Sequence, residues 1–414
     1  MPSLRSPLVV PIVVVGIAGG LIGAAYLGVL HILTTWLDPG NRSVIADLVV
    51  LAGTGLVVVI GERVLGRSGG VDLLIDNIHV GGGAGGREAR SVIPISLLCV
   101  AAGSTLGPEA PLVQTTGNFG DAVGARFGLS AEDRRVVAIA GMAAGFTVLF
   151  GAPVGGALFA LEILHRRGLE YYEALLPALV GSLCGFAVFS AITHVGLDRI
   201  WHVPFTGPLT TADLAWGAAA GAVGAVLARL FAATVRATRA GAARLPGWAP
   251  PVAAGLVLAG LAAISPFALT NGEAQLDSLL ATAGVGTLVL VAAVKMVGSA
   301  VAMAGRWKGG FIIPLFVAGF CLGTAAAPYL PSARPAVLGA ALAVGLCAAV
   351  TRTPLGSTLV ITEMTGLAIL PATLAAAVVA VVLARDVQVV ESQRRRPDRH
   401  PPETRPDAQS ESVA

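Results

Sequence analysis

Residues 103–111 read GSTLGPEAP and contain one charged side chain, Glu109, framed by Pro108 and Pro111. Apolar runs lie on both sides, SVIPISLLCVAA at 91–102 and AIAGMAAGFTVLF at 138–150. A lone carboxylate is costly inside a bilayer, so an acid there marks a functional site by default. Proline is common at the first helical position. The stretch therefore predicts a helix that begins within the membrane, with Glu109 in its first turn.

The composition agrees with a membrane protein. Of 414 residues, 55% are hydrophobic and 12% are charged, and the mean hydropathy is +0.81. A soluble domain carries about twice that charge. The net charge of +3 is too small to indicate a nucleic-acid partner. We predict an all-α integral membrane protein.

The apolar segments differ in length, and several are too short to cross a bilayer, which takes about 20 helical residues. They lie at 8–35, 46–62, 91–106, 111–127, 135–150, 152–164, 174–195, 212–233, 251–269, 283–304, 311–328, 334–350, 354–369 and 371–384. Short segments broken by Gly and Pro are typical of helices that end inside the membrane. Such ends are tolerated where they are buried in protein or line a water-filled cavity.

Basic residues gather in a few connections, including REAR at 87–90, HRR at 165–167 and VRATRAGAAR at 235–244. Arginine-rich loops favour the cytoplasmic side. We therefore expect a multi-pass protein of the cell inner (plasma) membrane with both termini in the cytoplasm. The polar, Pro-rich end of the chain predicts a disordered cytoplasmic tail at 392–414.

Two patterns recur along the chain at nearly one offset. FGAPVGGALFALE (150–162) matches TRTPLGSTLVITE (351–363), and GPEAPLV (107–113) matches GFIIPLF (310–316). We predict two membrane half-repeats, 1–200 and 205–390. Interrupted helices of duplicated transporters meet near the midplane and form the substrate site there. Because a helix N-terminus presents unpaired N–H groups and a partial positive charge, GPEAP and GFIIP are candidate anion-binding starts.

These motifs resemble those of the chloride-channel (CLC) family of anion channels and anion/proton antiporters, over residues of about 8–390. GPEAP is similar to the family's Gly-x-Glu-Gly-Pro motif, which puts Glu109 at the gating and proton-transfer position. The resemblance assigns anion binding to the remaining motif positions and to one serine: Ser68, Gly107, Pro108, Ala110, Phe311 and Ile312. It implies an inverted-repeat bundle of tilted and interrupted helices, in a homodimer with one pore per subunit.

The chain departs from the family's pattern, as a divergent prokaryotic-type member. Pro108 replaces the usual basic residue, and Ile312 replaces a phenylalanine of the second motif. Ile163 stands where antiporters of the family usually carry an inner proton-transfer glutamate. The neighbouring acid, Glu162, is a candidate for an inner proton path, although a structural role is the other interpretation. The family's C-terminal pore tyrosine has no match near 390–392.

Basic residues near the second motif have two interpretations. Lys295, Arg306 and Lys308 either raise the local anion concentration in a vestibule or anchor the helices at the lipid interface.

The sequence thus predicts transmembrane transport of chloride or a similar small anion, in exchange for protons. A passive, voltage-gated-type chloride channel is the alternative that Ile163 favours, and a fluoride exporter of the same family is a third. An intramembrane protease is disfavoured, because Ser68 has no histidine partner at a readable spacing. We expect no enzymatic activity, no cofactor and no metal. The expected partners are the anion, protons, the bilayer and a second copy of the chain.

Overall fold

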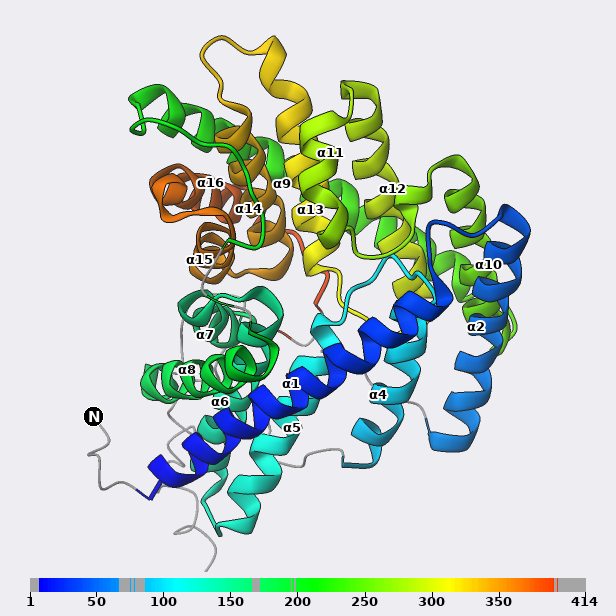
Figure 1. Cartoon of the computed structure of the whole chain (residues 1–414), viewed down its shortest axis with the longest axis vertical. Helices are drawn as coiled ribbons and strands as arrows, with labels where there is room; N and C mark the ends of the chain where they lie inside the picture. Colours follow the sequence, from blue (N-terminus) through cyan, green and yellow to red (C-terminus); the bar gives the residue numbers. More distant parts are fainter. Residues whose placement is uncertain are drawn as a thin grey trace, which may run out of the picture.

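The computed structural model describes residues 7–66, 75, 78, 86–165, 172–194, 196, 199–390 and 393 (Figure 1). These residues form α-helices joined by loops and short 3-10 turns, and no β-strand occurs among them. The predicted all-α architecture is confirmed.

The helices of the first part of the chain are α1 (Val9–Leu37), α2 (Val44–Leu65), α4 (Gly86–Ala101), α5 (Glu109–Arg126), α6 (Ala131–Phe150), α7 (Pro153–Glu162) and α8 (Leu175–Thr193). Those of the second part are α9 (Thr211–Ala242), α10 (Ala249–Ile264), α11 (Leu276–Thr282), α12 (Val285–Ala304), α13 (Ile312–Ala326), α14 (Pro335–Thr351), α15 (Pro354–Thr365) and α16 (Leu370–Leu383). Each predicted apolar segment overlaps one of them. The short helix α11 was not predicted, because its sequence is too brief and polar to show a period.

Helix lengths separate two groups among the described residues. Six helical stretches are long and apolar enough to cross a bilayer: Val9–Leu37, Val44–Leu65, Tyr172–Thr193, Thr211–Ala242, Val285–Ala304 and Ile312–Tyr329. Shorter apolar helices include Pro153–Glu162 and Leu370–Leu383. The chain is therefore a multi-pass membrane protein in which some helices stop within the bundle.

Glycine allows the helices to approach closely where α13 lies beside α14 (Figure 1). A Cβ at Gly319 would lie 2.3 Å from Cα of Ala343, and one at Gly323 would lie 2.4 Å from the carbonyl oxygen of Leu338. Lipid is as apolar as the helices, so their association relies on this close van der Waals packing.

Helices α7 and α15 cap each other. Glu162, the last residue of α7, accepts hydrogen bonds from the N–H groups of Leu355 (3.2 Å) and Gly356 (2.7 Å) at the start of α15. In return, Glu363 near the end of α15 accepts one from the N–H of Gly155 (3.1 Å) in the first turn of α7. Each carboxylate thus satisfies N–H groups that its partner helix cannot satisfy internally.

The reciprocal pair comes from the segments whose similarity predicts the two half-repeats. The two half-repeats, 1–200 and 205–390, remain a prediction.

Replacement of Gly319 by alanine tests the close approach of α13 and α14. Gly319→Ala should lower the free energy of unfolding by about 1–3 kcal/mol, because the added methyl group meets the backbone of α14. Gly53→Ala, in α2, is the matched control, since nothing lies within 4 Å of its Cβ position. Thermal unfolding in detergent measures both. Equal midpoints for the two variants would contradict the packing described.

Replacement of Glu162 by glutamine tests the reciprocal caps. Glu162→Gln removes the charge from two hydrogen bonds and should cost about 1–3 kcal/mol of stability. Glu363→Gln, which weakens the single hydrogen bond to Gly155, should cost less. The measurement is again the unfolding midpoint. A larger loss in Glu363→Gln than in Glu162→Gln would show that these caps do not set the stability of the pair.

Candidate functional site

The two predicted anion-binding motifs meet through a pair of backbone hydrogen bonds. The N–H of Gly107 donates to the carbonyl of Gly310 (2.8 Å), and the N–H of Gly310 donates to the carbonyl of Gly107 (2.7 Å). A Cβ at either glycine would displace the Glu109 carboxylate. It would lie 2.2 Å from Oε2 of Glu109 at Gly107 and 2.7 Å from it at Gly310. This bridge fixes the starts of α5 and α13 side by side.

Glu109 is the first residue of α5 and is fully buried. Its Oε1 accepts a hydrogen bond of 2.7 Å from the N–H of Ile313, in the first turn of α13. Its Oε2 lies against Gly107 and Gly310 and has no hydrogen-bond partner in the described part of the chain. The carboxylate therefore lies at the N-terminus of a second helix, α13, and helix N-termini are positions that bind anions.

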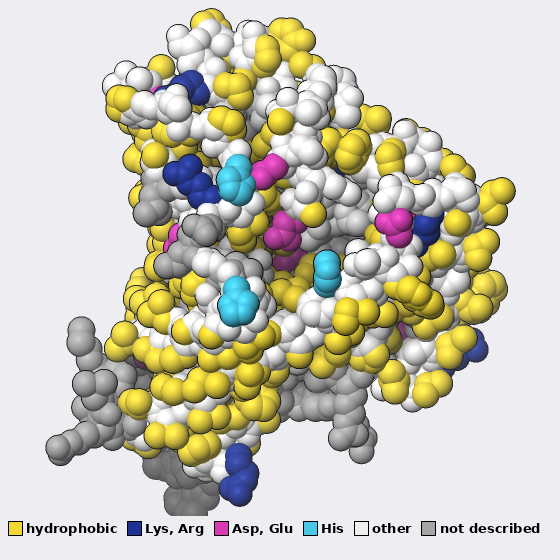
Figure 2. Space-filling view, viewed as in Figure 1, with side chains coloured by type: hydrophobic (Ala, Val, Ile, Leu, Met, Phe, Trp, Pro, Cys, Tyr) yellow, Lys and Arg dark blue, Asp and Glu magenta, His cyan; other side chains and the backbone are white. Residues whose placement is uncertain are grey.

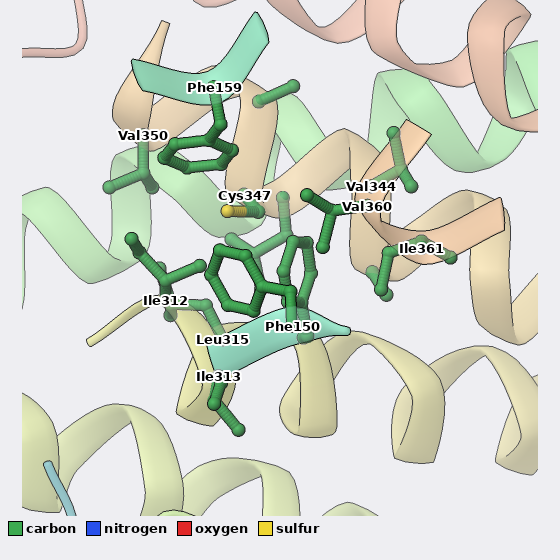
Figure 3. Packing of buried hydrophobic residues seen from close by; sticks show 14 of the residues in the cluster. Phe150, Phe159, Ile312, Ile313, Leu315, Val344, Cys347, Val350, Val360 and Ile361 are labelled. Carbon is green, nitrogen blue, oxygen red and sulfur yellow. The ribbon is translucent and has the colours of Figure 1, made fainter. Parts of the chain in front are cut away.

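Phe311 and Ile312 position the start of α13 through their side chains. Phe311 is the N-cap residue, and its ring packs on that of Phe231 with centroids 6.1 Å apart. Ile312 is buried in the apolar cluster that also contains Phe150 and Val350 (Figure 3). With the side chains held in the cluster, the residues at this helix start can offer backbone N–H groups to an anion. A phenylalanine is not required for that role.

The remaining residues of the motif also lack polar side chains. Pro108 is the N-cap residue of α5, and its carbonyl accepts from the N–H of Leu112 (3.2 Å). Ala110 is half-buried in the first turn of α5. Ser68 lies outside the described residues, so the structure leaves its predicted role untested.

The two residues of the predicted inner path, Glu162 and Ile163, have hydrogen-bond partners of their own. The Glu162 carboxylate is engaged with the start of α15. The side chain of Ile163 is buried, and its carbonyl accepts a hydrogen bond of 2.9 Å from Nε2 of Gln393. The same nitrogen donates to the carbonyl of Thr351 (2.6 Å).

Gln393 was not predicted to have a structural role, because it lies in a polar stretch that predicts a disordered tail. It is buried in the structure. The remainder of 392–414 lies outside the described residues.

The interpretation of Lys295 as a lipid-interface anchor is wrong. Lys295 is fully buried, and its Nζ donates to the carbonyls of Leu269 (2.9 Å) and Thr270 (2.7 Å). Residues far apart in sequence surround it, so no local pattern could reveal this position. Arg306 and Lys308 both lie near Glu62, with N–O distances of 3.1 and 3.8 Å.

Sequence comparison identifies relatives over most of the chain. The family model described as "Voltage gated chloride channel" matches residues 62–385. A "Putative chloride channel protein ClcB-like" from Ralstonia nicotianae is 31% identical, over 85% of this chain and 87% of its own length. A "Chloride/fluoride channel protein" from Pseudomonas syringae pv. tomato is 28% identical, over 85% of this chain and 79% of its own.

Solved structures show the same fold. The structure of a "slow cyanobacterial Cl-/H+ antiporter" superposes with a TM-score of 0.82 at 21% identity, covering 93% of this chain and 95% of that one. The structure of a "CLC-type fluoride/proton antiporter" gives 0.80 at 19% identity, covering 94% and 97%. The family model's match across most of the chain, together with relatives of similar length, shows that this chain belongs to the voltage-gated chloride channel (CLC) family.

Proposed function

We propose that the protein exchanges chloride for protons across the membrane and that Glu109 is its gate and proton carrier. The observation that carries this proposal is the hydrogen bond between Oε1 of Glu109 and the N–H of Ile313. An ionised carboxylate held there occupies the position in which an anion would accept the same hydrogen bond. Anion and carboxylate therefore compete for the start of α13.

Protonation of Glu109 would release it. A neutral carboxyl group accepts a weaker hydrogen bond than a carboxylate does, and it loses its attraction to the positive end of the helix. Chloride can then take the N–H groups of Phe311, Ile312 and Ile313. Loss of the proton from Glu109 to the opposite side restores the carboxylate, which returns to the start of α13 and expels the anion. The movement of protons and the movement of chloride are thereby linked at one site.

A passive chloride channel is the alternative, because Ile163 cannot carry a proton and Glu162 is held by α15. Two of the superposing proteins are antiporters, one of chloride and one of fluoride, and this supports exchange. The anion is a separate question. The names of the Pseudomonas syringae relative and of the fluoride/proton antiporter support a test of fluoride beside chloride.

We also propose a homodimer in the plasma membrane with both termini in the cytoplasm. Helices α7, α8, α15 and α16 lie along one edge of the molecule (Figure 1). This edge carries exposed apolar side chains, among them Leu183, Leu355 and Val378. A second copy packed there would leave each Glu109 in a site of its own.

Glu109→Gln mimics the protonated gate and tests the proposed exchange. In chloride-loaded liposomes with an outward chloride gradient and no proton gradient, the wild type should drive protons inward and raise the external pH. Glu109→Gln should retain chloride flux and reduce proton flux by about 100-fold, to the passive leak. Glu132→Gln, an exposed acid at the start of α6, is the control and should behave as wild type.

The same liposomes separate the alternatives. Chloride efflux at constant pH in the wild type would establish a passive channel. Proton movement that persists in Glu109→Gln would remove Glu109 as the carrier. Fluoride that drives protons strongly where chloride does not would identify a fluoride exporter.

A further inference from the structure

A loop segment lies against the stretch that leads into Glu109. We call residues 265–275, between α10 and α11, the strap. Oγ1 of Thr105 donates to the carbonyl of Ala268 (2.9 Å), and the N–H of Thr270 donates to the carbonyl of Gly103 (3.2 Å). The strap is thus bound to residues only a few positions before the gate.

Lys295 of α12 holds the strap in a defined conformation through the carbonyls of Leu269 and Thr270. Thr270 has a φ of +60°, which is rare for a β-branched residue. Gly272 has a φ of +88°, and a Cβ there would lie 2.9 Å from Cε of Lys295. The surrounding contacts impose this strained backbone, as is common at functional sites.

Glu273 is the one acidic residue of the strap. It is half-buried, and its carbonyl accepts a hydrogen bond of 3.2 Å from Nε1 of Trp201. Its Oε2 accepts a long hydrogen bond of 3.3 Å from Nδ2 of Asn271. The negative charge of Glu273 lies close enough to Glu109 to act on it electrostatically. The charge of Glu273 therefore influences the carboxyl group of Glu109.

Acidic side chains lie in the hollow at the centre of one face of the molecule, with histidine side chains around them (Figure 2). The titratable groups of the elements around Glu273 are Glu109, Lys295, and the pair of His202 and Asp277. Lys295 Nζ would lie 3.4 Å from a Cβ on the neighbouring Gly272. Nδ1 of His202 lies 3.1 Å from Oδ2 of Asp277, and both side chains are exposed. Glu273 is intermediate in exposure between this pair and the buried gate.

We propose that Glu273 is a second proton-transfer residue, which carries protons between the outer solution and Glu109. This inference rests on the proposed exchange. In each transfer the O–H bond of Glu273 breaks and an O–H bond forms on Glu109, directly or through water. Glu273 is left as a carboxylate and takes its next proton from solution. Transport in the opposite direction reverses these steps.

The environment of Glu273 suits this role. Burial raises its pKa to about 7, against the opposing effect of the hydrogen bond from Asn271. Below that pH the carboxyl group is protonated and can donate, and above it the carboxylate can accept. A group with a pKa near the working pH is the most efficient in proton transfer.

Glu273→Gln tests the proposal in the liposome assay with chloride and proton fluxes recorded together. Glutamine keeps the shape and the acceptor for Asn271 but carries no proton. Proton flux should fall by about tenfold or more while chloride flux changes less than about twofold. Asp277→Asn is the matched control from the same region and should keep both fluxes. Glu273→Asp should restore part of the proton flux.

The outcomes distinguish a failure of the proposed role of Glu273 from a failure of the proposed chloride/proton exchange. Equal proton fluxes in Glu273→Gln and wild type would overturn the role of Glu273 and leave the exchange intact. A wild type that moves no protons would overturn both. Parallel loss of both fluxes in Glu273→Gln, without recovery in Glu273→Asp, would overturn the proposal in favour of a structural role for the side chain. In the wild type, lowering the outer pH through about 7 should raise the proton flux from outside, and Glu273→Gln should remove this dependence.

Discussion

The hydrogen bond from the N–H of Ile313 to the carboxylate of Glu109 is the interaction on which the arrangement of the site depends. It joins the start of one interrupted helix to the start of another, across 204 positions of the chain. A helix that begins inside a membrane leaves N–H groups without water or lipid to accept from them. The carboxylate of Glu109, at the start of α5, supplies that acceptor for the start of α13. The partial positive charge of a helix start, which favours this carboxylate, also attracts anions in general.

The helix ends at α7 and α15 obey the same constraint with a different result. Glu162 and Glu363 are also carboxylates that accept from N–H groups at the start of another helix, but each lies toward a helix C-terminus and neither belongs to the glycine bridge. Gly107 and Gly310, by contrast, leave the Glu109 carboxylate against bare backbone. Glu109, Glu162 and Glu363 thus all accept hydrogen bonds at helix starts, but only Glu109 lies against the two glycines of the bridge.

The strap is bound to the stretch that leads into Glu109, through Thr105 and Gly103. Its conformation depends on Lys295, a buried cation whose two hydrogen bonds go to backbone carbonyls, and on Gly272, where a side chain would meet that lysine. A buried ammonium is costly unless its donors are satisfied. The contacts of Lys295 therefore give the chain a well-defined loop at this position, and this loop carries Glu273.

Much of the fold was predictable. Among the described residues, apolar runs and Gly-Pro breaks located each α-helix except α11. The lone acid between two prolines indicated a functional site, because a carboxylate in so apolar a setting is too costly to be retained without a role. The motif similarity also indicated the family. The roles of Ile313, Lys295, Glu273 and Gln393 were not predictable. Each depends on contacts with residues far away in the chain, and their own sequence surroundings are ordinary loops, helices and tail. The sequence by itself determined where helices begin, because local backbone preferences and hydropathy act over a few residues. Only the tertiary structure decided which helix start receives which carboxylate, because close packing at glycine brings those backbones together.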